Sequence, residues 1–421
     1  MANKEILASL EIINSEIRLL VGEFHNNRLN ILKVERVATE GIKGIQIIEE
    51  RPIIAAIRQA LGNVKHLLGV DVDAVILVIP SFDMIKKSVR VNIVSETMIK
   101  ERVTMQHFEN SLGKLLNTSA EDGYEIVNCV VTRFLADGVM SRKIPIGEDV
   151  NSLAVDVDLL CAKQELVYQY AGIVEKAGLK LLDVSMDNYA ICKEASLLEQ
   201  SFNEYIILVR QEEEYTTLSL ITQGRIVNCE LEMMGTGEML RAIMKKNHLP
   251  KEIARKLLLN NCRFQEKNPL ETPIYLWSEN GITTSVCEKE IVDEVKPLIQ
   301  KQIKEFLSLS HQILEKENVS LVLAGEAGSI LGIKKFYEES FGIPIRDYRP
   351  ETLGVRDGSV AAVSGNFYVY KDQLALRRAR QNSVDVVEFE RIMLEKRKPE
   401  EKEDDTLTNR FKGLFDRKAK Q

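Results

Sequence analysis

The sequence predicts an α/β protein made of two related lobes. The chain of 421 residues is too long for a single compact core. The same order of elements also occurs twice, because three closely spaced strand candidates are followed each time by helical segments and an almost entirely apolar strand. A cleft between two such lobes is a favoured place for a ligand.

The first lobe begins with an antiparallel meander of three strands joined by polar turns. A helix follows, and then a buried strand that ends at Pro80. We expect the strands over residues 6–12, 16–23, 28–34 and 74–79, and the helix over residues 50–61.

The second lobe repeats the meander after residue 200, and Gln223 and Gly224 form its second turn. Later in this lobe a buried strand runs directly into Gly325 and Gly328, and a helix follows. A strand, a glycine turn and a helix N-terminus together form a usual place to hold a phosphate or an adenosine. We expect strands over residues 205–209, 217–221, 225–230, 272–277, 319–324 and 343–346, and helices over residues 238–261, 288–316 and 329–341.

A third group of elements lies between the two lobes in the sequence. Its strands alternate with one helix, and a second helix then returns to the first lobe. We expect strands over residues 86–93, 125–131, 134–139 and 152–159, and helices over residues 103–116 and 166–178.

Composition and charge narrow the range of possible functions. A net charge of -7 gives no reason to expect nucleic acid as a partner. The six cysteines are far apart in the sequence, and several stand in apolar runs, so we expect reduced core thiols rather than disulfides or a zinc site. The N-terminus lacks the basic and apolar regions of a signal peptide, and no apolar run is long enough to span a membrane. We therefore expect a cytosolic protein.

The last fifty residues differ in kind from the rest. Residues 371–398 have helical spacing, and residues 399–405 are a charge run typical of a disordered linker. Residues 406–418 predict an amphipathic helix that lies flat on an anionic membrane, with a helix docked on the protein's own surface or on a partner as the alternative. Its apolar face carries Leu407, Phe411, Leu414 and Phe415, and its basic residues are Arg410, Lys412, Arg417, Lys418 and Lys420.

Two duplicated lobes, an insertion in each and an amphipathic tail together resemble FtsA, the actin-like bacterial division protein. Residues 134–139, 144–147 and 153–159 resemble the end of the family's inserted subdomain 1C, which actin lacks at this place. Residues 41–45 resemble a short family motif, residues 323–332 the adenosine motif, and residues 350–365 the helix that returns to the first lobe. The resemblance implies an actin-like two-lobed fold with ribonuclease-H-like duplicated lobes, an FtsA-type 1C subdomain and a C-terminal amphipathic helix.

The same resemblance implies a division of the chain into subdomains. We expect lobe 1 (subdomain 1A) at residues 1–83, 159–198 and 359–380, the 1C-like subdomain at 84–158, lobe 2 (2A) at 199–230 and 306–358, a 2B-like subdomain at 231–305, a charged linker at 381–405 and the membrane-targeting tail at 406–421.

The family's nucleotide site is degenerate in this chain. The first phosphate loop should contain the magnesium Asp, a Gly and a Ser, but residues 11–15 read Glu-Ile-Ile-Asn-Ser. The second should read Asp, an apolar residue, glycines and two threonines, but residues 211–217 read Gln-Glu-Glu-Glu-Tyr-Thr-Thr. Arg255 and Leu258 replace the Glu and Lys that the family offers to the nucleoside. The matching cleft positions are Glu11, Asn14, Ser15, Gln211, Glu213, Glu214, Thr216, Thr217, Gly235, Gly325, Glu326 and Gly328.

These losses favour a protein without a working ATP site. The carboxylates of Glu213 and Glu214 stand where polyphosphate would lie, and each would repel a phosphate charge in contact by roughly 4 kcal/mol at an effective dielectric constant of about 20. We expect no catalytic residues, no metal and no required cofactor.

The resemblance implies a peripheral protein on the inner face of the cell membrane at the division site. It would tether the tubulin-like division protein FtsZ, polymerise into a scaffold and have little or no ATPase activity. In the family, the FtsZ C-terminal peptide binds the 2B insertion, and the 1C subdomain contacts other division proteins. Lys296, Lys301 and Lys304 recur on the long helix of the 2B-like region and are candidate contacts for an acidic peptide, with a solvated helix face as the alternative.

Two other functions stay open. An actin-like ATP-binding division protein with a remodelled site would bind ATP and magnesium and use Glu11, Glu213 and Glu214 to hold the metal. A different actin-fold adaptor, such as a pilus-assembly or shape-determining protein, is disfavoured by the 1C-like segment and the tail.

Overall fold

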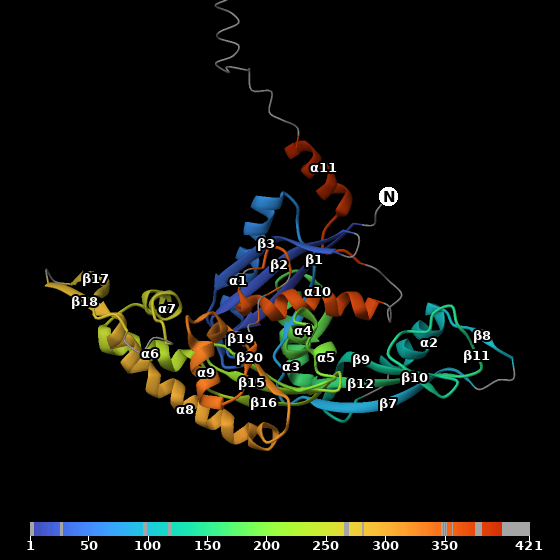
Figure 1. Cartoon of the computed structure of the whole chain (residues 1–421). Coiled ribbons are helices and arrows are strands. Elements are labelled where there is room, and N and C mark those ends of the chain that lie inside the picture. Colours follow the sequence, from blue (N-terminus) through green and yellow to red (C-terminus); the bar gives the residue numbers. More distant parts are fainter. Residues whose placement is uncertain are drawn as a thin grey trace, which may run out of the picture.

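The structure is a computed structural model that describes most of residues 4–397 (Figure 1). Residues 26–27, 96–98, 117–119, 265–268, 280–281, 347, 349, 351, 356 and 375–380 are not described within that range. The run 399–405 and the predicted membrane-binding tail, with all its apolar and basic residues, lie outside the described part of the chain.

Lobe 1 is built on a five-stranded sheet with helices on both faces. It comprises β1 (Glu5–Ile13), β2 (Glu16–His25), β3 (Arg28–Ala38), the short β4 (Ile42–Lys43) and β5 (Gln46–Ile47), α1 (Glu50–Leu68), β6 (Ala74–Ile79), α3 (Gln164–Lys176), β13 (Lys180–Met186), α4 (Asp187–Glu194), α5 (Leu197–Gln200), α10 (Ala361–Leu374) and α11 (Val386–Arg397). The strand order is β13-β6-β1-β2-β3. Residues of β1 alternate between the two faces, so Leu10 joins the cluster under α1 and α3, whereas Leu7 joins Phe367 of α10.

Lobe 2 is built on a second five-stranded sheet. It comprises β14 (Tyr205–Gln211), β15 (Thr216–Thr222), β16 (Arg225–Glu232), α6 (Thr236–Asn247), α7 (Lys251–Asn260), the hairpin β17 (Pro273–Glu279) and β18 (Ile282–Cys287), α8 (Glu288–Leu314), β19 (Val319–Gly325), the 3-10 turn η1 (Glu326–Ser329), α9 (Ile333–Phe341), β20 (Ile345–Arg346) and η2 (Gly358–Val360). The strand order is β16-β15-β14-β19-β20.

The two sheets have the same topology. In each, three antiparallel strands in chain order are followed by two strands that run parallel to the first. β1 therefore corresponds to β14, β6 to β19 and β13 to β20, and the predicted duplication of the lobes is present in the fold.

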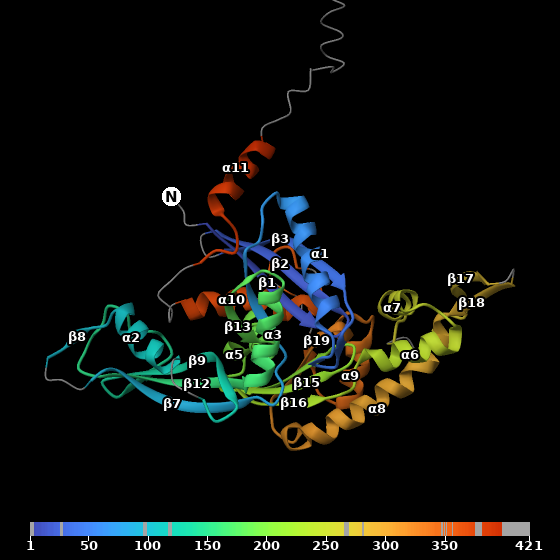
Figure 2. The same cartoon turned by 180° about the vertical axis from the view of Figure 1, so that it is seen from behind.

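A third group of elements, built around a further sheet that we call the inserted sheet, follows β6. The group comprises β7 (Ile85–Val94), β8 (Glu101–Arg102), α2 (Met105–Leu116), β9 (Tyr124–Ala136), β10 (Val139–Ser141), β11 (Asp149–Val150) and β12 (Leu153–Lys163). The main strands are ordered β10-β9-β12-β7, and α2 packs over Val155, Val157 and Leu159 of β12. This inserted sheet extends from one side of the molecule, whereas α7 and the β17–β18 hairpin extend from the other (Figures 1 and 2).

Two predicted boundaries were wrong for local reasons. Residues 134–139 are not a separate strand, because β9 continues to Ala136 and the chain then turns at Asp137 and Gly138, both with positive φ. The segment 329–341 is divided into η1 and α9. The predicted helical block 238–261 is present as two helices, since His248 ends α6 in the left-handed conformation and Pro250 precedes α7.

Candidate functional site

The cleft between the lobes brings two turns together. The β1–β2 turn of lobe 1 contains Asn14 and Ser15, and residues 212–215 connect β14 to β15 in lobe 2. In the family that the sequence resembles, these turns would be the two phosphate loops. Here they are joined by a buried network of ion pairs, which we call the cleft network: Glu11, Glu16, Arg18, Arg36, Asp187, Arg210 and Glu212.

Arg18 of β2 is the fully buried lobe 1 cation of the cleft network, with a side chain only 1% exposed, whereas that of Arg36 is 36% exposed. Its guanidinium makes a two-pronged pair with Glu212 of lobe 2, with Nη1–Oε1 at 3.1 Å and Nη2–Oε2 at 2.9 Å. It also donates to Glu16 at 2.7 Å, to Glu11 at 3.2 Å and to the carbonyl oxygen of Ser359. Arg18 thus links β1, β2, η2 and the second turn.

Arg210 of β14 is the lobe 2 cation and is equally buried. It donates to Glu11 and to Asp187, which belong to lobe 1, and to Glu212 of its own lobe at 3.0 Å. Asp187 begins α4 and also accepts from the backbone amide and the hydroxyl of Ser81. The two arginines therefore cross the cleft in opposite directions.

The charges of the cleft network shift its pKa values. Burial alone would raise the pKa of Glu16, but Arg18 and Arg36 outweigh it and lower that pKa to about 2. Burial likewise opposes the ionised form of Glu212, and Arg18 and Arg210 again lower the pKa. For Glu11 burial prevails over the same two arginines, and the pKa is raised. Four carboxyl groups thus share three guanidinium groups.

A second set of contacts lies beside the cleft network and is organised by Arg255 of α7. Its guanidinium donates to Glu326 at 2.6 Å, to Glu213 at 3.0 Å and across the cleft to the hydroxyl of Ser15 at 3.3 Å. Glu326 also accepts from Thr236, and burial raises its pKa although Arg255 opposes the shift. Arg255, noted in the sequence as a departure from the family pattern, binds carboxylates of its own chain.

The N-terminus of α6 is occupied by backbone. The amide of Thr236 donates to the Glu212 carbonyl at 3.0 Å, and that of Gly237 to the Glu213 carbonyl at 2.8 Å. Gly235 permits this approach, because a Cβ there would lie 2.1 Å from the Glu212 carbonyl oxygen. Helix N-terminal amides are the groups that a phosphate would require, and these two already donate to carbonyl oxygens.

Other predicted cleft residues, on β14, β15 and β19, contact groups of lobe 2. Gln211 bonds to Gln302 of α8 at 2.8 Å and to Tyr337 of α9 at 3.0 Å. Thr216 donates to the Met234 carbonyl at 2.7 Å, whereas the buried hydroxyl of Thr217 has no hydrogen-bond partner among the described residues. Gly325 has a φ of 80° and lies against the Gln211 backbone, where a Cβ would be 2.5 Å from the carbonyl oxygen.

A hollow remains beside the filled part of the cleft. Its volume is about 600 Å³, and Glu326, Gly328, Ser329, Asn260 and Lys334 are among its lining residues. It lies next to the segment that resembles the adenosine motif. The hollow borders the cleft network, because Arg36 and Ser359 also line it.

The carboxylates proposed to hold a metal each face cations of the protein. Glu11 pairs with Arg18 and Arg210, Glu213 with Lys251 and Arg255, and Glu214 with Arg241 near the surface. Within the described ranges, no three His, Cys, Asp or Glu side chains are grouped so as to hold a metal ion.

Sequence reasoning missed the cations of the cleft network. Arg18 and Arg210 stand in strands with long apolar runs, and Asp187 follows the unpredicted strand β13. An arginine inside a strand that is buried on both faces requires buried carboxylates nearby, so the signal was present in the strand pattern. Glu212 was recognised only as one of three consecutive glutamates. The structure shows that it is the one that pairs with both arginines.

The predicted partner-binding lysines lie on the exposed side of α8. Lys296, Lys301 and Lys304 are all exposed, and the ammonium of Lys296 lies 5.5 Å from the ring centroid of Phe336. Their role as contacts for an acidic peptide stays a prediction. The structure describes no helix long and apolar enough to cross a membrane.

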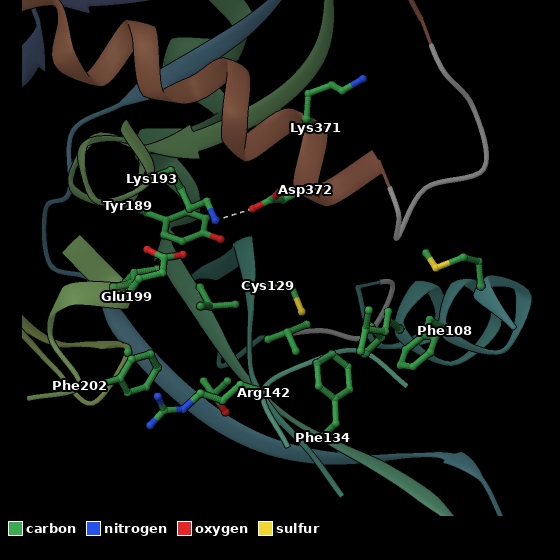
Figure 3. A pocket seen from close by; sticks show the side chains of 18 residues that line it. Phe108, Cys129, Phe134, Arg142, Tyr189, Lys193, Glu199, Phe202, Lys371 and Asp372 are labelled. Carbon is green, nitrogen blue, oxygen red and sulfur yellow. Dashed lines mark ion pairs between the residues drawn. The ribbon is translucent and has the colours of Figure 1, made fainter. Parts of the chain in front are cut away.

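A second cavity of about 620 Å³ lies between the inserted sheet and lobe 1 (Figure 3). Phe108 of α2 and Phe134 of β9 line one side of this cavity. Lys193 of α4 and Asp372 of α10, paired at 2.6 Å, lie on the opposite side. Arg142 lies over the ring of Phe202 at its edge. We call this cavity the insertion groove.

Comparison with known proteins gives relatives by sequence and neighbours by fold. No protein-family model matches the chain. Cell division protein FtsA of Streptococcus pneumoniae is 22% identical over 368 residues, which cover 86% of this chain and 79% of the relative. FtsA of Bacillus subtilis is 21% identical over 368 residues, which cover 85% and 81%. FtsA of Staphylococcus epidermidis is 21% identical over 356 residues, which cover 83% and 75%.

Solved structures with the same fold include three actin-like proteins. The PilM-PilN type IV pilus biogenesis complex matches with a TM-score of 0.58 at 12% identity, over 86% of this chain and 98% of the other. The ethanolamine utilization protein EutJ of Carboxydothermus hydrogenoformans matches with 0.50 at 12% identity, over 89% of each chain. MreB5 of Spiroplasma citri bound to ADP matches with 0.50 at 10% identity, over 88% and 97%. At such identities these matches establish the fold alone, while the sequence relatives agree on one name. The chain is therefore a distant relative of cell division protein FtsA, with an actin-like fold.

Proposed function

We propose that this protein is an FtsA-like scaffold that tethers FtsZ filaments to the inner face of the cytoplasmic membrane and has little or no ATPase activity. The relatedness to FtsA over more than four fifths of the chain supports a role in cell division. The cleft network carries the non-enzymatic part of the proposal, because paired side chains fill the place that a triphosphate and its metal would need.

Three surfaces are assigned to partners in this proposal. The 2B-like region with the exposed Lys296, Lys301 and Lys304 takes the acidic C-terminal peptide of FtsZ. The inserted sheet contacts other division proteins and further copies of the chain. The tail, with Phe411 at the centre of its apolar face, binds anionic lipid.

The tether is tested first against FtsZ. A pull-down with FtsZ from the same organism should retain the full-length partner and lose FtsZ that lacks its C-terminal peptide. Equal retention of both forms would contradict the assignment to the 2B-like region, and retention of neither would contradict the tether.

The membrane contact is tested by co-sedimentation with anionic liposomes. Phe411→Glu removes an apolar side chain from the predicted interface and should lower binding about tenfold, because burying such a side chain at the interface is worth about 1.5 kcal/mol at most. Asn409→Glu adds the same charge on the polar face and is the matched control. If both variants bind equally well, or if Phe411→Glu also lowers the melting temperature, the tail is not the membrane anchor.

The alternative is an actin-like ATP-binding division protein with a remodelled site. The hollow of about 600 Å³ next to Gly328 is the observation in its favour. Thermal stabilisation of the protein by ATP and magnesium would support this alternative.

A further inference from the structure

The two lobes are joined by contacts of two different kinds. Away from the cleft, one continuous apolar cluster includes Ile191 and Cys192 of lobe 1 together with Leu208 and Val322 of lobe 2. At the cleft, buried ion pairs connect the two lobes. Arg18 reaches Glu212 from lobe 1, and Arg210 reaches Glu11 and Asp187 from lobe 2.

The side chains of the cleft network supply the charges that a bound nucleotide and its cation would otherwise supply. Glu11, Asp187 and Glu212 provide buried negative charge between the two turns, and Arg18 and Arg210 provide the positive charge that binds it from both lobes. We propose that the cleft network is a built-in substitute for nucleotide, which holds the two lobes at one fixed closed angle in the ligand-free protein.

The geometry explains why one angle is preferred. The Arg18–Glu212 pair has two parallel hydrogen bonds, and this arrangement tolerates little rotation of one lobe against the other. A partly opened cleft would leave Glu11, Asp187 or Glu212 with a missing partner before water could replace it, and a buried unpaired carboxylate is strongly disfavoured. Intermediate angles are therefore penalised. A bistable contact of this kind is the usual basis of a discrete conformational state.

The consequence for function is that closure does not depend on ATP. A scaffold whose lobes are always closed presents the same surfaces for self-assembly at every nucleotide concentration. Assembly would then respond to protein concentration, membrane and partners.

The unmodified protein provides the first test. Small-angle X-ray scattering and amide hydrogen exchange at the two cleft turns are measured with and without millimolar ATP and magnesium. The proposal expects the same radius of gyration and the same slow exchange in both conditions. A compaction or a protection of the turns that appears only with ATP would overturn it.

A pair of variants provides the second test. Arg210→Met breaks the pairs with Glu11 and Asp187 that cross the cleft, and it should raise exchange at both turns at least tenfold and increase the radius of gyration. Arg263→Met is the control, because Arg263 pairs at 3.1 Å with Glu288, a fully buried carboxylate whose partner lies in the same lobe. It should leave exchange at the cleft turns unchanged. Equal effects of the two variants on these turns would overturn the proposal.

A milder variant covers the case in which Arg210→Met does not fold. Arg18→Lys keeps the charge but cannot form the two-pronged pair with Glu212. It should speed exchange at the turns several-fold while the protein stays folded, and unchanged exchange in this variant would overturn the proposal.

Discussion

Arg18→Met should lower the melting temperature by about 6 °C. Removing one member of a buried ion pair costs about 3–5 kcal/mol, because the remaining charge stays buried without its partner. The structure indicates the lower end of this range. Glu11 and Glu212 each keep Arg210, and Glu16 keeps Arg36 at 2.6 Å, so no carboxylate loses its last cation. A cost of about 3 kcal/mol corresponds to about 6 °C at roughly 2 °C per kcal/mol for a large domain.

A double-mutant cycle isolates the contact that crosses the cleft. Arg18→Met, Glu212→Gln and the double variant are compared by differential scanning calorimetry. The two losses should not add, because the second substitution removes the carboxylate that the first left short of a partner. We expect a coupling of about 0.5–3 kcal/mol. Additive losses, or a melting temperature of Arg18→Met within 2 °C of the original protein, would show that the Arg18–Glu212 pair does not stabilise the closed form.

Two further predictions concern acid and nucleotide. Glu16 has a pKa of about 2 in the folded protein, against an ordinary value of 4.5. The stability that its ionised form contributes is therefore complete above about pH 4.5 and is lost as the pH falls towards 2. Over this pH range the melting temperature should fall more steeply in the original protein than in Glu16→Gln. Calorimetric titration with ATP and magnesium should show no micromolar binding, because the paired side chains of the cleft network fill the place that a triphosphate and its metal would need. A micromolar Kd would favour the ATP-binding alternative.

Strand patterns in the sequence predicted both meanders, because buried strands carry long apolar runs. Residues 74–79 were assigned with the bounds of β6, and the first three strands differ from β1–β3 by only a few residues. β13 was missed because Asp183 and Ser185 interrupt its apolar pattern, although both residues are buried in the fold. The mixed pattern reflects polar partners from other elements, such as the Ser185–Asn366 hydrogen bond, and these are not visible in a local window.

For the cleft, the sequence could predict only which nucleotide-binding residues are missing. The missing glycines and the missing magnesium Asp are local facts of residues 11–15 and 211–217. What replaced the ligand depends on pairing between residues about 200 positions apart, such as Arg18 with Glu212 and Arg210 with Glu11. Those pairs arise only when the two lobes are placed together. The sequence therefore indicated that polyphosphate is disfavoured, but not which side chains fill its place.

The inserted sheet is connected to the cleft network through the core of lobe 1. Its longest strand, β9, does not stop at the edge of lobe 1, since Val127 and Val130 are part of the main core. Between them, the Asn128 side chain accepts a hydrogen bond at 3.0 Å from the amide of Met186, the residue just before Asp187. Asp187 in turn pairs with Arg210. The inserted sheet is thus connected, through Asn128 and the backbone of Met186, to the carboxylate that binds the opposite lobe.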